Sequence, residues 1–359
     1  MKTTLCEPTT NTALISRSAI QEYYGKVLSR TEDLQTNACC TSGGMPPHLS
    51  EIAQLIAPEV IEKFYGCGSP IPPAVDGCTV LDLGCGSGRD VFFCSKLVGE
   101  SGRVIGVDMT QEQLAVARRH ADEQARRFGF RHPNTIFYHG YIEDLVALGI
   151  TDESVDVVIS NCVINLSPYK EQVFREIMRV LKPGGELLFS DVFADRRLDP
   201  ALQRDPVLVG ECLAGALYWE DFRRLMQRLG VPDVRVLEQS PFTVDNPAIA
   251  ARFGGAQFRS VTVRAFKIAG LEDRCEDYGQ VAVYTGGILG APHLFRLDDH
   301  HVFEEARPLR VCGNTAAMLQ DTRLARFFHV TGDRSRHFGL FPCESAPVSV
   351  VVPPGRGCC

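Results

Sequence analysis

The feature that most constrains the fold is an alternation, from Thr79 to Asp191, of short apolar runs with segments of helical periodicity. Short apolar runs bounded by turn residues are typical of buried strands. Strands that alternate with helices form a mainly parallel sheet with helices on both faces. The sequence therefore predicts a doubly wound α/β fold whose five strands cover residues 80–83, 104–108, 135–138, 155–160 and 186–191.

Helical periodicity appears within this unit, at residues 170–181, and also on both sides of it. Helices are expected over residues 14–30, 48–64, 170–181, 206–216 and 219–229. Residues 182–185, Lys-Pro-Gly-Gly, are expected to form the turn before the fifth strand. A β-rich portion that includes residues 260–267 is expected next. A small α+β module is expected after it, with strands in 280–285 and 295–303, a helix over 315–328 and a loose tail from Gly332.

Composition narrows the classes of function. The 359 residues are 45% hydrophobic and 23% charged, which is ordinary for a globular chain of two or three domains. The net charge of −7, with both signs interspersed, predicts neither a nucleic-acid partner nor a membrane surface. No run of about 18 apolar residues exists and residues 1–11 lack the apolar core of a signal peptide, so a soluble, cytosolic protein is expected. A monomer is expected because no obvious apolar seam is left over.

Fourteen cysteines need an explanation in such a chain, because a reducing compartment keeps thiols available as ligands or redox groups. They form no paired C-x-x-C motifs, so a structural zinc site is not expected. Cys162 lies at the exit of the fourth predicted strand, where ligands of such sheets bind. For this residue alone, packing as a small buried side chain is an equal alternative.

A glycine-rich motif, Asp-Leu-Gly-Cys-Gly-Ser-Gly at residues 82–88, follows the first strand and opens a helix. Gly84, Gly86 and Gly88 permit a tight turn and bring the backbone close to a nucleoside, with Asp82 inside the strand. The third glycine comes one residue too early for the pyrophosphate-binding pattern. Asp108 ends the second strand, where a carboxylate can accept hydrogen bonds from both ribose hydroxyls.

Further side chains could complete an adenine pocket. Met109 could cover one face of the ring, although core packing is an equal alternative. Ile142 and Glu143 follow the third strand and could contact the ring and its exocyclic amine. For Glu143, a charge that favours a helix N-terminus is the competing interpretation.

In order and position, these features resemble the class I S-adenosylmethionine-dependent methyltransferases, over roughly residues 50–192. The resemblance implies S-adenosylmethionine as cofactor. Asn161 and the first glycine loop are then expected to fix its methionine end, and Tyr65 to cover the sulfonium by a cation–π contact unless it is a packed aromatic. The fold alone does not identify the methyl acceptor.

The cysteines indicate the acceptor. The sequences around Cys39 (34–39), Cys67 (65–68), Cys162 (160–166) and Cys212 (210–219) resemble those of arsenite methyltransferases, the animal-type enzymes especially. The resemblance implies that Cys67, Cys162 and Cys212 bind arsenic(III), and that Cys39 joins them in disulfide chemistry. Soft thiolates do select soft inorganic centres.

The resemblance implies methyl transfer to arsenite, or its glutathione conjugates, and to methylarsenite, giving mono- and dimethylated arsenicals. Arsenic carries no proton that must leave, so positioning and dehydration supply the rate. The pentavalent state binds thiolates poorly, and the resemblance implies that enzyme cysteines return two electrons. We predict a Cys39–Cys67 disulfide in this step, reduced again by thioredoxin or glutathione.

Four regions are expected on this basis. They are an N-terminal helix with a mobile cysteine loop (1–49), the cofactor-binding domain (50–192), an arsenic-binding region (193–267) and a C-terminal α+β module with its tail (268–359). Packing roles are expected for Cys78, Cys85 and Cys94, whereas Cys275, Cys312 and Cys343 match no ligand of the family.

Two other functions stay open. A methyltransferase that acts on a carbon or oxygen nucleophile would need a base near the methyl group, and no well-placed histidine or carboxylate is apparent. A thiol-rich protein that only sequesters metalloids or zinc would need no adenosyl pocket, which the glycine motif argues against.

Overall fold

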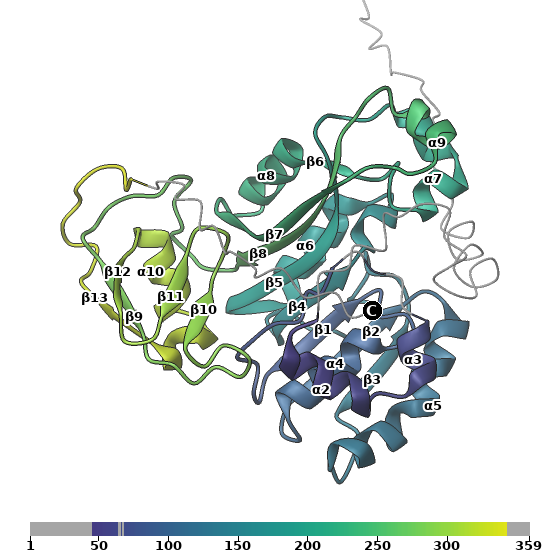
Figure 1. The fold of residues 1–359 in the computed structure, drawn as a ribbon, viewed down its shortest axis with the longest axis horizontal. Coiled ribbons are helices and arrows are strands. Elements are labelled where there is room, and N and C mark those ends of the chain that lie inside the picture. The colour runs from purple at the N-terminus through teal and green to yellow at the C-terminus, as the bar shows by residue number, and fades with distance from the viewer. Residues whose placement is uncertain (1–44, 64–65, 67, 343–359) are drawn as a thin grey trace, which may run out of the picture.

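A mainly parallel sheet forms the centre of the molecule (Figure 1). The structure is a computed structural model that describes residues 45–63, 66 and 68–342. The strands are β1 (Thr79–Leu83), β2 (Arg103–Asp108), β3 (Thr135–His139), β4 (Val155–Asn161), β5 (Leu181–Ala194), β6 (Leu217–Tyr218), β7 (Val234–Phe242) and β8 (Phe258–Phe266). Their order is β3-β2-β1-β4-β5-β8-β7, with β6 beside β5. Strands β1 to β5 are parallel, which confirms the predicted fold class.

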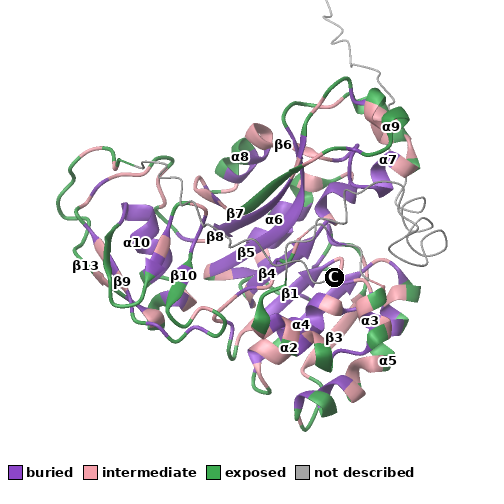
Figure 2. Ribbon diagram, viewed as in Figure 1, coloured by how far each residue is buried: buried purple, intermediate pink, exposed green. Residues whose placement is uncertain are grey.

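Helices cover both faces of this sheet. Side chains alternate along each strand, so Val157 and Ile159 of β4 pack with α4 (Arg89–Val98) and α5 (Gln111–Phe128). Val158 packs instead with α6 (Lys170–Val180) and α8 (Trp219–Arg228). Strands β1, β4 and β5 are accordingly buried along most of their length (Figure 2). This burial on both faces explains why these strands read as continuous apolar runs.

The helix expected over 48–64 is broken. It forms α2 (Pro47–Leu55) and α3 (Pro58–Glu62), because Pro58 has no N–H to donate and keeps Ala57 extended. Strand β5 begins at Leu181, so the turn expected at 182–185 lies within its first residues. The helix expected over 14–30, with the cysteine loop after it, lies outside the described residues.

The helix expected over 206–216 is also wrong in length. Only α7 (Pro206–Gly210) forms, and a short 3-10 turn (Pro200–Arg204) precedes it. The chain then turns at Cys212, whose φ is 61°. At Gly215 it passes so close to Asn165 that a Cβ would lie 2.0 Å from that residue's carbonyl oxygen. The helix expected over 219–229 is confirmed as α8, and α9 (Pro247–Arg252) follows β7.

Strands β7 and β8 come from the region expected to bind arsenic, yet they extend the central sheet. Strand β8 pairs antiparallel with β5 from Glu186↔Phe266 to Ala194↔Phe258, and β7 pairs antiparallel with β8. Residues 193–267 therefore share the sheet, and part of its core, with the cofactor-binding unit.

The C-terminal module is a separate α+β layer, in green and yellow at the left of Figure 1. It consists of β9 (Val281–Tyr284), β10 (Leu294–Arg296), β11 (Val302–Glu304), β12 (Pro308–Arg310), α10 (Gly313–Gln320) and β13 (Phe328–Thr331). Strands β12, β9 and β13 form one antiparallel sheet, and β10 and β11 form a hairpin. The helix expected over 315–328 ends at Gln320 and is followed by a 3-10 turn (Arg323–Phe327).

A buried ion cluster joins this module to the central sheet. Glu186 of β5 accepts a hydrogen bond from Arg264 Nε of β8 at 2.6 Å and forms an ion pair with Arg323 of the module. Arg264 Nη1 in turn donates to the carbonyl oxygen of Leu297. Burial alone would raise the pKa of the Glu186 carboxyl, but the two guanidinium groups outweigh it and hold that pKa below its usual value.

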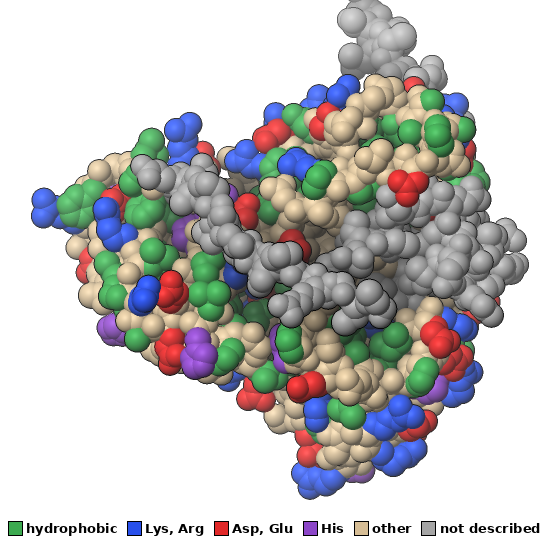
Figure 3. Space-filling model, in the orientation of Figure 1, with side chains coloured by type: hydrophobic (Ala, Val, Ile, Leu, Met, Phe, Trp, Pro, Cys, Tyr) green, Lys and Arg blue, Asp and Glu red, His purple; other side chains and the backbone are tan. Residues whose placement is uncertain are grey.

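The sequence predicts a loose tail from Gly332, but backbone hydrogen bonds fix this segment to the module as far as Phe341. The amide of Phe338 donates to the carbonyl oxygen of Asp277, and the amide of Phe341 donates to that of Cys275, both at 2.8 Å. Basic and acidic side chains are interspersed on the face shown in Figure 3. Within the described residues, no helix has both the length and the apolar character needed to cross a membrane.

Candidate active site

A pocket opens at the carboxyl ends of β1, β2 and β4, where ligands of doubly wound sheets bind. All predicted cofactor-binding residues line it except Tyr65, which lies outside the described residues, and Gly88. The lining includes Asp82, Gly84, Gly86, Asp108, Met109, Ile142, Glu143, Asn161 and Cys162. Gly88 instead caps α4 at a φ of 91°, where a Cβ would meet Ala117, Phe137 and Phe92.

The two glycines of the loop that line the pocket serve different purposes. At Gly84 (φ 75°) a Cβ would lie 2.3 Å from the Val163 side chain, so close packing requires glycine. At Gly86 (φ 51°) a Cβ would meet nothing within 4 Å. Gly86 therefore presents bare backbone to the pocket, which fits a bound nucleoside.

Asp108 ties this loop to the end of β2. Its Oδ2 accepts a hydrogen bond from the amide of Gly86 at 2.8 Å, and its Oδ1 accepts one from the amide of Thr110 at 2.7 Å. Burial raises the pKa of this carboxyl, although these backbone hydrogen bonds offset part of the effect. Each carboxylate oxygen keeps a further lone pair for a ribose hydroxyl.

Two polar residues missed in the sequence complete the pocket wall. Ser167 donates to Glu143 Oε1 at 2.5 Å, which orients that carboxylate inside the pocket and argues against a purely helix-capping role. Asn161 Nδ2 donates to Asp90 Oδ2 at 3.1 Å and to the carbonyl oxygen of Gly68 at 2.9 Å. Asp90 is the second residue after the glycine motif, in the first turn of α4, and this position could have indicated it.

Cys162 and Cys212 meet at one side of this pocket. Cys162 follows β4 directly and Cys212 follows α7, and both are buried. Both have left-handed backbone, with φ of 56° and 61°, among only five such non-glycine residues in the described part of the chain. This conformation costs on the order of 1 to 3 kcal/mol at a non-glycine residue and tends to gather at functional sites.

A buried carboxylate lies beside these two cysteines. One oxygen of Asp191 and the Sγ atoms of Cys162 and Cys212 all lie within 4.8 Å of one another. The expectation that no carboxylate is near the acceptor site is therefore wrong. Asp191 lies inside an apolar run of β5, and only the register of that strand places its side chain in the site.

Burial shifts the ionisation of Asp191 and of its neighbour Lys170. It raises the pKa of Asp191 to about 7, although the amides of Val192 and Asn165 donate to this carboxyl at 2.9 and 3.0 Å. It lowers the pKa of Lys170 to about 8, against the opposing attraction of Asp191. The site therefore holds two groups that titrate near neutral pH.

Cys67, the third predicted arsenic ligand, and Cys39, expected to join in the disulfide chemistry, both lie outside the described residues. Gly68, the residue after Cys67, packs against the end of β5, where a Cβ at Gly68 would lie 2.4 Å from Ser190 Oγ. Cys162 is disulfide-bonded in the structure. Since a disulfide sulfur is not a thiolate, Cys162 must be reduced before it can bind a metalloid.

Three cysteines of the cofactor-binding domain, Cys78, Cys85 and Cys94, differ from Cys162 and Cys212. Cys94 is fully buried and packs in the core under α4, whereas Cys78 is only half-buried. Cys85 is buried and also lines the pocket. Burial raises the pKa of all three thiols, which makes them poor nucleophiles and poor ligands.

Comparison with known proteins shows the family to which this chain belongs. A family model for a methyltransferase domain matches residues 74–230, and one for the arsenite methyltransferase C-terminal domain matches residues 278–353. An arsenite methyltransferase of Aquipseudomonas alcaligenes is 56% identical, over 90% of this chain and 93% of its own length. The chain belongs to the arsenite methyltransferase family. It is thus an S-adenosylmethionine-dependent methyltransferase.

Other members of the arsenite methyltransferase family agree. The human arsenite methyltransferase is 43% identical, over 86% of this chain and 82% of its own length. The crystal structure of CrArsM, an arsenic(III) S-adenosylmethionine methyltransferase from Chlamydomonas reinhardtii, superposes with a TM-score of 0.80 at 51% identity. That match covers 83% of this chain and all of CrArsM. The similarity therefore extends to bacterial, algal and animal members.

Proposed function

We propose that this enzyme transfers methyl groups from S-adenosylmethionine to trivalent arsenic held by the thiolates of Cys67, Cys162 and Cys212. The observation that carries the proposal is the meeting of two buried cysteines, Cys162 and Cys212, at the edge of the nucleoside-type pocket. Cys162 belongs to both, because it lines that pocket and also lies beside Cys212. Soft thiolate ligands suit a soft metalloid, and the names of the relatives indicate the same substrate.

The cofactor-binding residues have separate tasks in this proposal. Asp108 accepts hydrogen bonds from the ribose hydroxyls, and Gly86 lets the backbone approach the nucleoside. Met109, Ile142 and Glu143 surround the adenine. Asn161, held by Asp90, orients the methionine end. S-adenosylmethionine supplies, when bound, a methyl group on a sulfonium centre.

The surroundings of the thiols exclude water. Cys162 and Cys212 belong to an apolar cluster with Leu208, Val209 and Leu213. As each cysteine replaces a hydroxide ligand of arsenite, the thiol proton leaves with that hydroxide as water, and a dry site disfavours the return of the water. Arsenic then keeps a lone pair that no proton blocks, so orientation by the cysteines replaces a general base.

Electron balance explains why more than three cysteines are proposed. Methyl transfer raises arsenic from the trivalent to the pentavalent state, and two thiolates return two electrons by forming a disulfide. We propose that Cys39 and Cys67 form it and that thioredoxin or glutathione reduces it by thiol exchange. The need for reduced cysteine thiolates and for thioredoxin or glutathione fits a reducing compartment such as the cytosol. We also propose a monomer, because one chain supplies every ligand.

A second candidate function has one observation in its favour. Asp191, whose pKa burial raises to about 7, could act as the base of a methyltransferase for a carbon or oxygen nucleophile. Its two oxygens already accept backbone hydrogen bonds, however, and it lies beside the sulfur atoms of two cysteines. We therefore assign it a structural place beside the arsenic ligands.

One experiment separates these functions. The reduced enzyme is incubated with arsenite, a thiol reductant and methyl-labelled S-adenosylmethionine, and the arsenicals are separated. We expect labelled mono- and dimethylated arsenic. Arsenic that stays bound but unmethylated would indicate sequestration only. The absence of both binding and labelled arsenicals, from an enzyme shown to bind S-adenosylmethionine, would refute the proposal.

A further inference from the structure

Two cysteines of the C-terminal module have no place in the proposed methyl transfer. Cys312 is the N-cap residue of α10 and is fully buried, and Cys275 lies half-buried in the loop before β9. Backbone hydrogen bonds fix their segments together, because the amide of Gly313 donates to the carbonyl oxygen of Glu276 at 2.9 Å. The amide of Phe341 holds the carbonyl oxygen of Cys275 from the other side.

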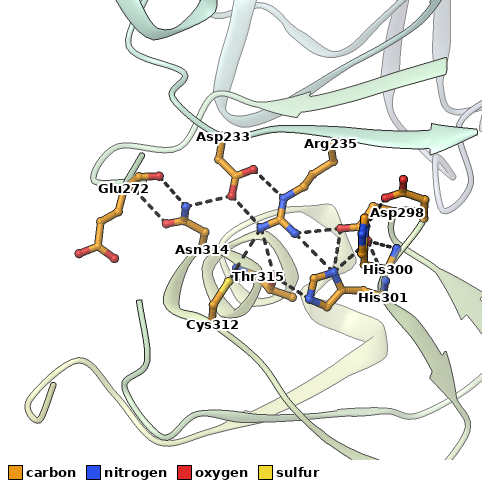
Figure 4. A network of polar contacts seen from close by, with 10 residues as sticks. Asp233, Arg235, Glu272, Asp298, His300, His301, Cys312, Asn314 and Thr315 are labelled. Carbon is orange, nitrogen blue, oxygen red and sulfur yellow. Dashed lines mark hydrogen bonds and ion pairs between the residues drawn. The ribbon is translucent and has the colours of Figure 1, made fainter. Parts of the chain in front are cut away.

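The two thiols are in hydrogen-bond contact with each other, and neither is in a disulfide in the structure. The Cys312 sulfur also receives a hydrogen bond from the amide of Thr315 at 3.4 Å and lies 3.3 Å from Thr315 Oγ1. Arg235 Nη2 of β7 donates to the same sulfur at 3.9 Å (Figure 4). Donors thus surround this sulfur, as they would a thiolate.

Arg235 is held rigidly in this position. It donates to both oxygens of Asp233 at 2.6 Å and to Asp298 Oδ2 at 2.9 Å, as Figure 4 shows. His301 bonds the same Asp298 carboxylate and lies 3.5 Å from Thr315 Oγ1. The guanidinium group therefore cannot turn away from the sulfur without breaking buried ion pairs.

These contacts favour ionisation of Cys312. The hydrogen bond from Cys275, with help from Arg235 and Thr315, outweighs burial and lowers the pKa of Cys312 to about 5. A stabilised thiolate is a good leaving group in thiol–disulfide exchange. Of the two residues, Cys275 is half-buried and Cys312 is buried, so Cys275 is the more accessible one.

We propose that Cys275 and Cys312 form a redox-active dithiol that interconverts with a disulfide by exchange with small thiols and disulfides, with Cys275 as the entry point. This site is separate from the methyl-transfer site and does not depend on it. Its ligand class is the low-mass thiol–disulfide couple, of which glutathione is the natural probe.

The exchange balances in two steps. In oxidation, the Cys275 thiol passes its proton to the Cys312 thiolate, attacks a small disulfide and releases one small thiolate; Cys312 then gives up that proton, attacks the Cys275 sulfur and releases the second small thiolate. Counted from two protonated thiols, the two cysteines lose two electrons and two protons, and the small disulfide becomes two thiols. In reduction, a small thiolate attacks Cys275, Cys312 departs as a thiolate, and a second small thiolate frees Cys275.

The test measures this disulfide directly in the full-length protein. The enzyme is equilibrated across a series of reduced-to-oxidised glutathione ratios, quenched by alkylation and digested with trypsin. Cleavage after Arg274, Arg296, Arg310 and Arg323 places Cys275 and Cys312 in separate peptides with one cysteine each. The linked peptide pair should appear as the ratio becomes oxidising and disappear reversibly.

A matched pair of variants tests the role of the thiolate. Thr315→Val removes the hydroxyl beside the Cys312 sulfur, and Thr315→Ser keeps it. Loss of one hydrogen bond to a charged sulfur should make the disulfide about tenfold harder to reduce in Thr315→Val. Thr315→Ser should behave like the native chain.

Two outcomes would overturn the proposal. One is the absence of the linked peptides at every glutathione ratio. The other is an equal shift in the two Thr315 variants, which would indicate a packing effect. Methylation activity is not the readout, so failure here leaves the proposed arsenic chemistry untouched.

Discussion

The Sγ atom of Cys212 donates a hydrogen bond to the backbone carbonyl oxygen of Cys162 at 3.1 Å. The two residues are 50 positions apart, and both have left-handed backbone. Cys162 directly follows strand β4, and Cys212 lies in the turn after α7. The fold thus holds two cysteines from distant segments together as a unit.

Replacing either thiol of this pair should abolish methylation. We expect Cys162→Ser and Cys212→Ser to lose activity towards methylarsenite as well as arsenite, because a hydroxyl is a poor ligand for a soft centre. Cys78→Ser, a half-buried thiol outside the pocket, is the control and should stay active. Substantial turnover of methylarsenite by either site variant, measured by arsenic speciation, would exclude a ligand role for that cysteine.

An alanine variant is usually more stable than a glycine variant at the same position, but the left-handed backbone at Cys212 should reverse this order of stability. Both Cys212→Ala and Cys212→Gly remove the thiol, but only glycine adopts a φ of 61° without strain. We expect the glycine variant to be more stable by about 1 kcal/mol in urea unfolding. A more stable alanine variant would show that the backbone there is not strained.

Asp191 should make stability depend on pH. Burial raises the pKa of this carboxyl from 3.8 to about 7, so folding favours its protonated form. Its contribution is fully present below about pH 4 and is lost as pH rises through about 7.

The variant Asp191→Asn removes this titration. Between pH 4.5 and 6.5, the free energy of unfolding of the native chain should fall relative to the variant by roughly 1 kcal/mol per pH unit. Parallel curves in urea unfolding at several pH values would mean that Asp191 is ionised in the folded enzyme throughout.

The ion cluster between the sheet and the C-terminal module should be sensitive to its central carboxylate. Glu186→Gln leaves Arg264 and Arg323 buried without a counter-charge, and we expect a loss of about 3 to 5 kcal/mol. Asp221→Asn breaks an exposed ion pair with Arg197 and should change stability far less. Equal effects of the two substitutions in chemical denaturation would argue against the cluster as a structural link.

Four of the five parallel strands, β1, β2, β4 and β5, could be predicted because burial along most of their length makes each one a mainly apolar run, whereas the edge strand β3 is only partly buried. The glycine motif and Asp108 were equally visible, since their roles depend on local sequence and on strand order. The length of α7 could not be predicted from the sequence. Apolar residues at helical spacing continue to residue 216, but the approach of Gly215 to Asn165 forces the chain to turn at Cys212.

The roles of Asp191, Glu186 and Arg235 could not be predicted from the sequence, because they depend on tertiary contacts. Asp191 and Glu186 both lie in the apolar run that became β5, where a buried acid has no signature of its own. Their partners come from other parts of the chain, as Arg264 and Arg323 do for Glu186. The contact of Arg235 with Cys312 spans 77 positions and could not be inferred from spacing.

The arsenic ligands themselves are tested most directly by X-ray absorption at the arsenic edge. The enzyme is reduced, loaded with one equivalent of arsenite without S-adenosylmethionine, and compared with Cys162→Ser and Cys212→Ser. We predict arsenic bound by three sulfur atoms and no oxygen in the native chain, and fewer sulfur ligands in each variant. An unchanged sulfur shell in both variants would contradict the account, because arsenic would then be held elsewhere.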